Sequence, residues 1–304
     1  MPDISLITSL YRSEKHLPLY IARVQKLATQ LDLSLQIVVV VNDATDTETT
    51  LLEKFSKQEI VAVKVLHCER ETLYASWNRG IAQADSAILG FWNVDDIRTA
   101  EGLAEGHRLL NSSADLVDFG FIIQQDETSE YHPPQYNPSK ISPKTGTSPF
   151  FMFHRNLYNL TQAFNPNFRI SGDFEWCKRE TVRQATIAYS DSVAGTFILH
   201  GDNLSGGANP REWVEFNIAL LIHNALDNLR PVDPNLMHQL WDEWGHQYAT
   251  ISDETANWLW GAGARERYEK YTAERQQHPL IRRFRLALAR RGLLQSTEWD
   301  VHHG

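Results

Sequence analysis

Two adjacent carboxylates, Asp95 and Asp96, follow an apolar segment that ends at Trp92. Like charges side by side repel each other, and each is destabilised when it leaves water. The pair therefore either holds a positively charged group or faces water in a loop. Asn93 stands just before the pair and adds a neutral hydrogen-bonding amide.

Other polar side chains recur near the ends of apolar segments in the first hundred residues. They are Thr8, Ser9 and Tyr11, then Asp43, then Asn78, and finally Asn93 and Asp95. A single Asp at a strand end is most often a turn or helix-cap residue. The whole set, in this order, favours a shared binding site.

The elements that must position these side chains alternate between strand and helix patterns. Strands are predicted at 4–8, 35–41, 61–66, 87–92 and 115–123, and helices at 17–31, 46–55, 72–84 and 99–111, with Asp46 as the N-cap of the second helix. Repeated β-α-β units predict an α/β fold with a parallel, doubly wound sheet. Ligands of such sheets bind beyond the carboxyl ends of the strands, where the polar side chains lie.

The remainder of the chain changes character twice. Residues 124–149 contain five prolines among polar residues, which predicts a long surface loop. Residues 150–200 mix helix and strand patterns. Beyond residue 210 the pattern is helical and rich in Trp, with helices expected at 211–228, 234–248, 253–273 and 279–291.

The composition and the absence of certain motifs exclude several classes of function. The chain has 304 residues and a formal net charge of -9, which argues against nucleic acid as a partner. Two separated cysteines, no signal-peptide pattern and no long apolar run predict a cytoplasmic protein. Neither a G-x-x-x-x-G-K-[ST] phosphate loop nor a G-x-G-x-x-G dinucleotide fingerprint is present.

Four segments of the first half resemble the motifs of family-2 glycosyltransferases, which have the GT-A fold. They are ITSLYRSE after the first strand, VVVVNDATD at the second, the segment 75–80 with Asn78, and Asn93-Val94-Asp95-Asp96 in place of the family's D-x-D-D. The resemblance implies a mostly parallel, Rossmann-like sheet flanked by helices. It implies a nucleotide-sugar-binding half over 1–125, an acceptor-binding half over 126–208 and a helical extension over 209–304.

The resemblance also implies roles for the donor-side residues. The expected nucleotide-sugar contacts are Thr8, Ser9, Tyr11, Asp43, Arg70, Asn78, Asn93, Val94 and Asp95, with Arg79 as a weaker candidate. A divalent cation, Mg²⁺ or Mn²⁺, is expected on the diphosphate, with Asp95 as its main ligand and Asp96 as a supporting one. Asn93 replaces the first acid of the family motif and brings no charge. The alternative is an acidic turn that caps the next helix.

In the second half, RISGDFEWCKR (169–179) resembles the family's acceptor-side segment, and Asp173 takes the place of the catalytic base. The alternative is that Asp173 caps a helix. His200 follows a late strand and is expected near the metal or the diphosphate, with a structural role as the alternative. Trp176 could stack on an acceptor sugar, although a helical Trp is more often part of a core.

Together these features predict transfer of a sugar, with inversion, from a nucleotide diphosphate to a glycan or another hydroxyl acceptor. The family favours UDP as the nucleotide. One alternative is a binding protein that keeps the fold without turnover, as Asn93 suggests. A sugar nucleotidyltransferase would carry a Gly-rich, Arg-containing loop after the first strand, and this chain does not.

The tail carries six arginines and no acid between Arg275 and Arg291, in a net-acidic protein. One helical face of this segment is apolar, so residues 275–291 could lie on an anionic membrane surface, at the inner face of the membrane. The segment could equally pack on the acidic body of the protein or on a second subunit of a homodimer. We favour packing.

Overall fold

The computed structural model divides the chain into two compact units, Met1–Arg230 and Pro231–Gly304. It describes residues 1–201, 203, 204, 212, 215, 216, 218–220, 223 and 228, all of them in the first unit. The helices predicted at 234–248, 253–273 and 279–291 lie outside the described residues, and the one at 211–228 is described only in part. The first unit includes residues 209–230, which the sequence places in the helical extension.

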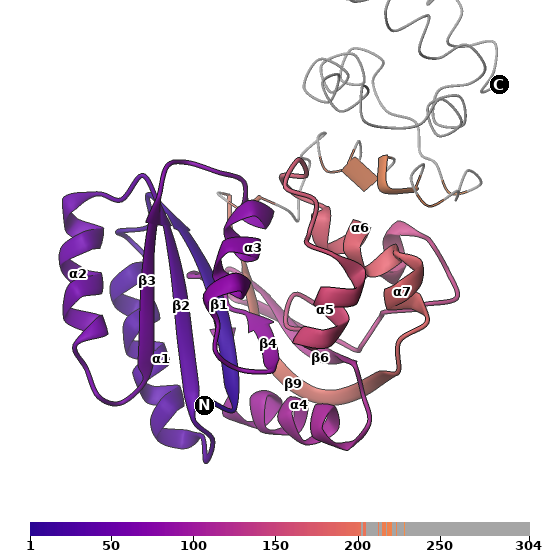
Figure 1. Ribbon diagram of the computed structural model, residues 1–304, viewed down its shortest axis with the longest axis horizontal. Helices are drawn as coiled ribbons and strands as arrows, with labels where there is room; N and C mark the ends of the chain where they lie inside the picture. Colours follow the sequence, from indigo (N-terminus) through magenta and orange to yellow (C-terminus); the bar gives the residue numbers. More distant parts are fainter. Residues whose placement is uncertain are drawn as a thin grey trace, which may run out of the picture. The chain divides into compact units, whose positions relative to one another are not determined.

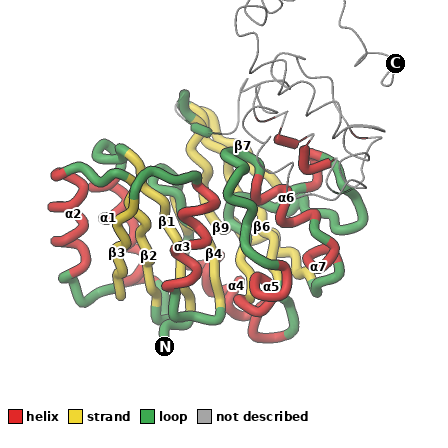
Figure 2. The backbone as a smooth tube through the Cα atoms, turned by 45° about the horizontal axis from the view of Figure 1, so that its top comes forward, coloured by secondary structure: helices red, strands yellow, loops and turns green. Residues whose placement is uncertain are grey.

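Nine strands of the described residues form one mixed sheet in the order β3-β2-β1-β4-β8-β6-β9-β5, with β7 paired to β6 (Figures 1 and 2). The strands are β1 Ile4–Tyr11, β2 Leu35–Asn42, β3 Ala62–Cys68, β4 Ile88–Phe91, β5 Ile97–Arg98, β6 Leu116–Gln125, β7 Thr128–His132, β8 Met152–His154 and β9 Ile187–Leu199. The first four pair in parallel, as predicted. Every residue of β2 is buried, because helices cover both faces of the sheet there.

The helices are α1 Leu17–Gln30, α2 Asp46–Ser56, α3 Leu73–Gln83, α4 Ala100–Ser112, α5 Arg155–Thr161, α6 Gly172–Lys178 and α7 Glu180–Arg183, with a 3₁₀ turn at Pro143–Thr145. In Figure 1, α3 crosses in front of β1 and β2, and α1 lies behind the sheet. Helix α1 buries Leu17, Tyr20, Val24 and Leu27, which follow helical spacing. None of the helices in the described part of the chain combines the length and apolar character that crossing a bilayer requires.

The second half of the sheet departs from the prediction of a parallel sheet. Strand β8 lies between β4 and β6 and runs antiparallel to both. The surface loop predicted over 124–149 is wrong in part, because β7 folds back on β6 as a hairpin and residues 143–145 form the 3₁₀ turn. Two-residue and three-residue strands such as β5 and β8 are too short to show a period in the sequence.

The start of α2 ties two loops of the carboxyl edge together. Its N-cap is Thr45 rather than the predicted Asp46, because Thr45 and Glu48 form a reciprocal capping box. The buried Glu48 carboxylate also accepts a hydrogen bond from the Ser13 N–H over 2.6 Å. One side chain therefore holds both the loop after β1 and the loop after β2.

Candidate active site

The carboxyl ends of β1 and β2 and the start of α3 are joined by Asn42. Its buried amide nitrogen donates to the Leu10 carbonyl over 3.1 Å and to the Ser76 hydroxyl over 3.0 Å. Its amide oxygen accepts from the Glu71 N–H over 2.9 Å. Asn42 therefore fixes the three segments that carry the expected nucleotide contacts, while it is itself hidden from a ligand.

Tyr11, Asp43 and Arg70 form an exposed group on this edge. The Arg70 guanidinium lies 4.1 Å from the centre of the Tyr11 ring. The backbone N–H of Arg70 donates to the Asp43 carboxylate over 3.1 Å. Asp43 has a φ of 45°, a left-handed conformation that is uncommon outside glycine and recurs at binding sites. An aromatic face, a cation and a carboxylate thus stand together in solvent.

Two predicted nucleotide contacts point elsewhere. Thr8 is fully buried, and its hydroxyl bonds with the Tyr20 phenol and donates to the Trp92 carbonyl. Asn78 binds the Phe164 backbone through both ends of its amide and accepts from the Tyr158 phenol. These two side chains hold the scaffold together. Ser9 is partly buried, and its hydroxyl lies 3.4 Å from the Asn42 amide nitrogen.

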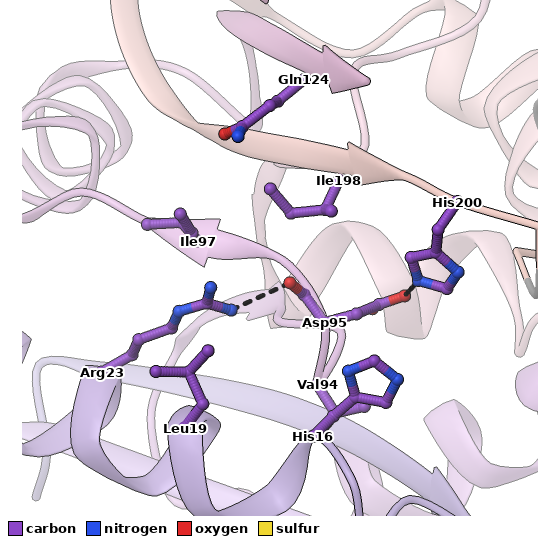
Figure 3. Close-up of a pocket in the computed structure, with 9 residues that line it drawn as sticks. All are labelled: His16, Leu19, Arg23, Val94, Asp95, Ile97, Gln124, Ile198 and His200. Carbon is purple, nitrogen blue, oxygen red and sulfur yellow. Dashed lines mark hydrogen bonds and ion pairs between the residues drawn. The ribbon is translucent and has the colours of Figure 1, made fainter. Parts of the chain in front are cut away.

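The acidic loop after β4 brings Asp95 to His200, as Figure 3 shows. The Asp95 carboxylate lies 2.9 Å from His200 Nε2, and the Asn203 amide approaches the same oxygen over 3.5 Å. From α1, the Arg23 guanidinium donates to the backbone carbonyls of Asp95 and Asp96, over 2.9 and 3.1 Å. Arg23 thus fixes the backbone of the loop and leaves the Asp95 side chain free to face His200.

Asp96, predicted as a supporting metal ligand, turns inward. It is only 1% exposed, and its two oxygens accept from the Asn93 amide and the Ile198 N–H over 3.0 and 3.1 Å. Burial, with the neighbouring Asp95 charge, raises the pKa of Asp96 to about 7. Asp96 and Asn93 therefore stabilise the loop against β9, and Asp95 is the carboxylate of the pair that stays accessible.

A pocket of about 360 Å³ lies beside the Asp95–His200 pair. Its lining comes from α1 and its N-cap, the acidic loop and the strands around it: His16, Leu19, Arg23, Val94, Asp95, Ile97, Gln124, Ile198 and His200 (Figure 3). The His16 ring stacks on the His200 ring at 5.6 Å between centres.

The fit of a divalent cation can be judged from these donors. Among the described residues no cluster of three or more acidic, His or Cys side chains could enclose a metal. Mg²⁺, however, is often held by one or two carboxylates with substrate phosphates and water completing its shell, and imidazole suits several transition metals. Asp95 and His200 fit that open arrangement.

Asp173 occupies the second position of α6, and the residue as a whole is partly exposed. It accepts a hydrogen bond from the Tyr74 phenol over 2.9 Å, and Tyr74 belongs to the first turn of α3. A Cβ at Gly172 would lie 2.7 Å from the Tyr74 ring, so only glycine permits this approach. Burial raises the pKa of Asp173, against the opposing bonds from the Phe174 N–H and Tyr74. Ser171, and not Asp173, is the N-cap of α6, but the Asp173 carboxylate accepts a hydrogen bond from the Phe174 N–H of the first turn over 2.8 Å.

Other residues of the same segment are structural. Trp176 is fully buried in a cluster of aromatic rings, with its indole N–H on the Gln162 carbonyl, so it cannot stack on an acceptor. Glu175 turns away from Asp173 into an ion pair with Arg179 and a contact with His223. Arg79, a weaker nucleotide candidate, forms a two-pronged ion pair with Glu71.

The sequence matches the family described as glycosyl transferase family 2 over residues 5–179, more than half of the chain. The chain belongs to this family. A comparison with curated proteins finds no match. The match over residues 5–179 confirms the family-2 resemblance seen in the motifs, and the chain is a glycosyltransferase.

Solved structures of other proteins have a similar fold. Residues 1–349 of TarS from S. aureus, in complex with UDP-GlcNAc, superpose with a TM-score of 0.56 at 14% identity, over 81% of this chain and 72% of that one. The mannosyltransferase PcManGT from Pyrobaculum calidifontis, in complex with GDP-Man and Mn²⁺, gives 0.55 at 14% identity, over 90% and 83%. The family-2 chain therefore has the GT-A fold, as predicted.

Several residues of this family-2 site escaped the sequence analysis. His16, Leu19 and Arg23 recur at spacings of three and four, which places them on one side of α1, and this signal could have been read. Tyr74 carries no such signal. Its bond to Asp173 joins residues 99 apart in the chain and depends on how α3 and α6 pack.

Proposed function

We propose that this family-2 chain transfers a sugar from a UDP-sugar to a hydroxyl of a glycan or similar acceptor, with inversion at the anomeric carbon. The observation that carries the proposal is Asp173, a partly exposed residue whose carboxylate is held by Tyr74 at the start of α3. Ser76 of the same helix binds Asn42, which joins the donor-side loops. One helix thus connects the proposed base with the proposed donor edge.

On the donor side we assign the nucleoside to Tyr11 and Asp43, with Arg70 beside them. The Tyr11 face can take a base, and the Asp43 carboxylate can accept hydrogen bonds from base or ribose groups. Nucleotide complexes of TarS and PcManGT, which share the fold, support a nucleotide-sugar donor. The family alone favours UDP over GDP.

The diphosphate is assigned to the Asp95–His200 pair, next to Val94 and Asn93. A bound Mg²⁺ or Mn²⁺ would add positive charge where the diphosphate gains negative charge as it leaves. The Mn²⁺ in the PcManGT complex, which shares the fold, supports the use of a divalent metal. Asp95 supplies the accessible carboxylate, and Arg23 keeps its loop in place.

In the transfer step, the Asp173 carboxylate removes the proton from the acceptor hydroxyl. The oxygen then attacks the anomeric carbon from the side opposite the leaving diphosphate. The new glycosidic bond forms as the bond to the phosphate oxygen breaks, which inverts the configuration.

A panel of nucleotide-sugars, scored by thermal unfolding with Mn²⁺, Mg²⁺ or EDTA, tests the proposal. A bound donor raises the unfolding temperature by mass action, so one nucleotide should stand out in the presence of metal. Stabilisation by no nucleotide at any metal concentration would contradict the proposal. The best donor then enters a transfer assay with candidate glycan acceptors, and the anomeric configuration of the product is read by NMR.

A non-catalytic nucleotide-sugar-binding protein is the second candidate. It is favoured by the neutral Asn93 and by Asp96, which faces inward and leaves a single accessible carboxylate in the acidic loop. Such a protein would bind a donor tightly, yet neither hydrolyse it nor transfer its sugar to any acceptor.

A further inference from the structure

Glu215 inserts a buried carboxylate under the segment that leads into α6. One oxygen accepts hydrogen bonds from the N–H groups of Ile170 and Ser171 over 2.8 and 2.9 Å, and the two oxygens share the N–H of Arg169 at 2.9 and 3.1 Å. Glu215 is fully buried. Three successive backbone donors thus converge on one carboxylate.

This arrangement has an energetic consequence. A buried carboxylate is strongly destabilising unless hydrogen bonds compensate it, and bonds to a charged acceptor are about twice as strong as neutral ones. If Glu215 loses its charge, the three N–H groups lose their strong acceptor together. Three of the backbone hydrogen bonds that hold residues 169–171 therefore depend on this side chain.

The same segment is held from its other side by α3. The Tyr74 phenol contacts the Ile170 carbonyl and also donates to Asp173. Ser171, the N-cap of α6, has no side-chain bond to the helix, so backbone contacts must set where α6 begins. Glu215 therefore binds the backbone of Ile170 and Ser171, and Tyr74 contacts Ile170 as well. These two residues lie directly before Gly172 and Asp173 and so help to set the position of the Asp173 carboxylate.

A second contact joins the same region of the chain to α6. His223 Nε2 lies 3.1 Å from the Glu175 carbonyl and 3.2 Å from its carboxylate. Glu215 and His223 both lie outside the motifs of the first half. They also lie outside residues 5–179, which match the family.

We propose that Glu215 is a positioning residue for the transfer reaction: its carboxylate sets the backbone of residues 169–171 and so places Asp173 against the acceptor hydroxyl. The inference rests on the proposed function, because it takes Asp173 as the base. It assigns a role in the reaction to Glu215, which lies beyond the nucleotide-binding and acceptor halves defined by the motifs.

The charge of Glu215 also acts on Asp173 directly. Burial is the main cause that raises the pKa of Asp173, and the Glu215 charge adds to it, while the Phe174 N–H and the Tyr74 phenol oppose it. Replacing Glu215 by Gln removes the negative charge and lowers the pKa of Asp173. A base works in its ionised form, so the acid limb of the pH–rate profile should move to lower pH.

The test compares Glu215→Gln, Glu215→Asp and, as a control, Glu101→Gln in the first turn of α4. Displacing a reacting group by about 1 Å can cost up to about 100-fold, so we expect at least about a tenfold loss of kcat in both Glu215 variants, with donor affinity unchanged. The acid limb should move to lower pH in Glu215→Gln and stay in place in Glu215→Asp. Wild-type kcat and an unmoved acid limb in a folded Glu215→Gln protein would overturn the proposal.

A measurement on the unaltered protein covers the case in which the variants do not fold. Hydrogen exchange should show the amides of residues 169–171 protected as strongly as those of α6, and rapid exchange there would overturn the proposal. Asp173→Asn separates the two levels of inference. If Asp173→Asn is inactive while Glu215→Gln is normal, only the positioning role fails. If Asp173→Asn retains turnover, the proposed function itself fails.

Discussion

Tyr74 donates a hydrogen bond from its phenol to the Asp173 carboxylate over 2.9 Å, across 99 residues of sequence. The bond stabilises the ionised carboxylate and lowers the pKa of Asp173, whereas burial raises it. Removing the phenol therefore raises that pKa. Because the base must be ionised, a protein without the phenol should lose its activity at a higher pH than the wild-type protein when the solution is acidified.

Tyr74→Phe should thus move the acid limb of the pH–rate profile to higher pH, opposite to the shift expected for Glu215→Gln. The measurement is kcat over pH 4–9 at saturating donor. Tyr158→Phe, which removes a phenol that bonds to Asn78 instead, is the matched control. If the acid limb moves the same way in both Tyr74→Phe and Tyr158→Phe, the result would contradict a specific effect of Tyr74 on the pKa of Asp173.

Asp173→Asn tests the base itself. Asn keeps the size of the side chain and an oxygen for the Tyr74 bond, but it cannot take the acceptor proton. Transfer should fall by about 10²–10⁴ with donor affinity nearly unchanged. Asp32 lies before the amino-terminal end of β2, so Asp32→Asn should leave transfer and donor affinity unchanged. Near wild-type turnover in Asp173→Asn would return Asp173 to a structural role.

Asp95→Ala tests the metal. In the wild-type protein Mn²⁺ or Mg²⁺ should tighten the binding of a nucleotide diphosphate, because a cation held by Asp95 would offset the negative charge of the phosphates. The variant should bind with one affinity whether metal or EDTA is present. Calorimetric titrations under both conditions give the answer. Equal affinities in the wild-type protein would remove the metal from the mechanism.

Arg23→Met tests the support of the acidic loop. The variant keeps the length of the side chain but loses the bonds to the Asp95 and Asp96 carbonyls. We expect a loss of about 1–2 kcal/mol in the free energy of unfolding, and weaker metal-dependent donor binding. Lys26→Met, exposed on the same helix, should change neither quantity. Metal-dependent binding that survives Arg23→Met intact would show that the loop holds itself.

The basic tail lies outside the described residues, and its roles stay predictions. If residues 275–291 bind an anionic membrane, the full chain should sediment with vesicles that contain phosphatidylserine, and less so at high salt. Deletion of 275–304 should abolish sedimentation and keep nucleotide binding. A deletion variant that fails to fold would instead favour packing, and sedimentation velocity of the full chain shows whether a second copy takes part.

The donor half was largely predictable because its strands and helices are long and periodic. The strands β1 to β4, the helices between them, the exposed Tyr11 and Asp43 and the partly exposed Asp95 follow from local patterns and motif order. The inward turn of Asp96 was not predictable, since its partner at Ile198 lies 102 residues away. The structural roles of Thr8 and Asn78 are hidden for the same reason: a polar side chain looks identical in sequence whether it meets a ligand or the backbone of a distant loop.

The position of β8 between β4 and β6 bears on how the chain can be cut and how it folds. Strand β4 is a buried central strand only when residues 152–154 have arrived beside it, and β6 depends on the same three residues. A truncated protein that ends at residue 125 would leave one edge of β4 and both edges of β6 unpaired, which invites aggregation. During synthesis, the parallel β1–β4 layer must wait for a partner made from a later part of the chain, so expression of the donor half alone should yield insoluble material.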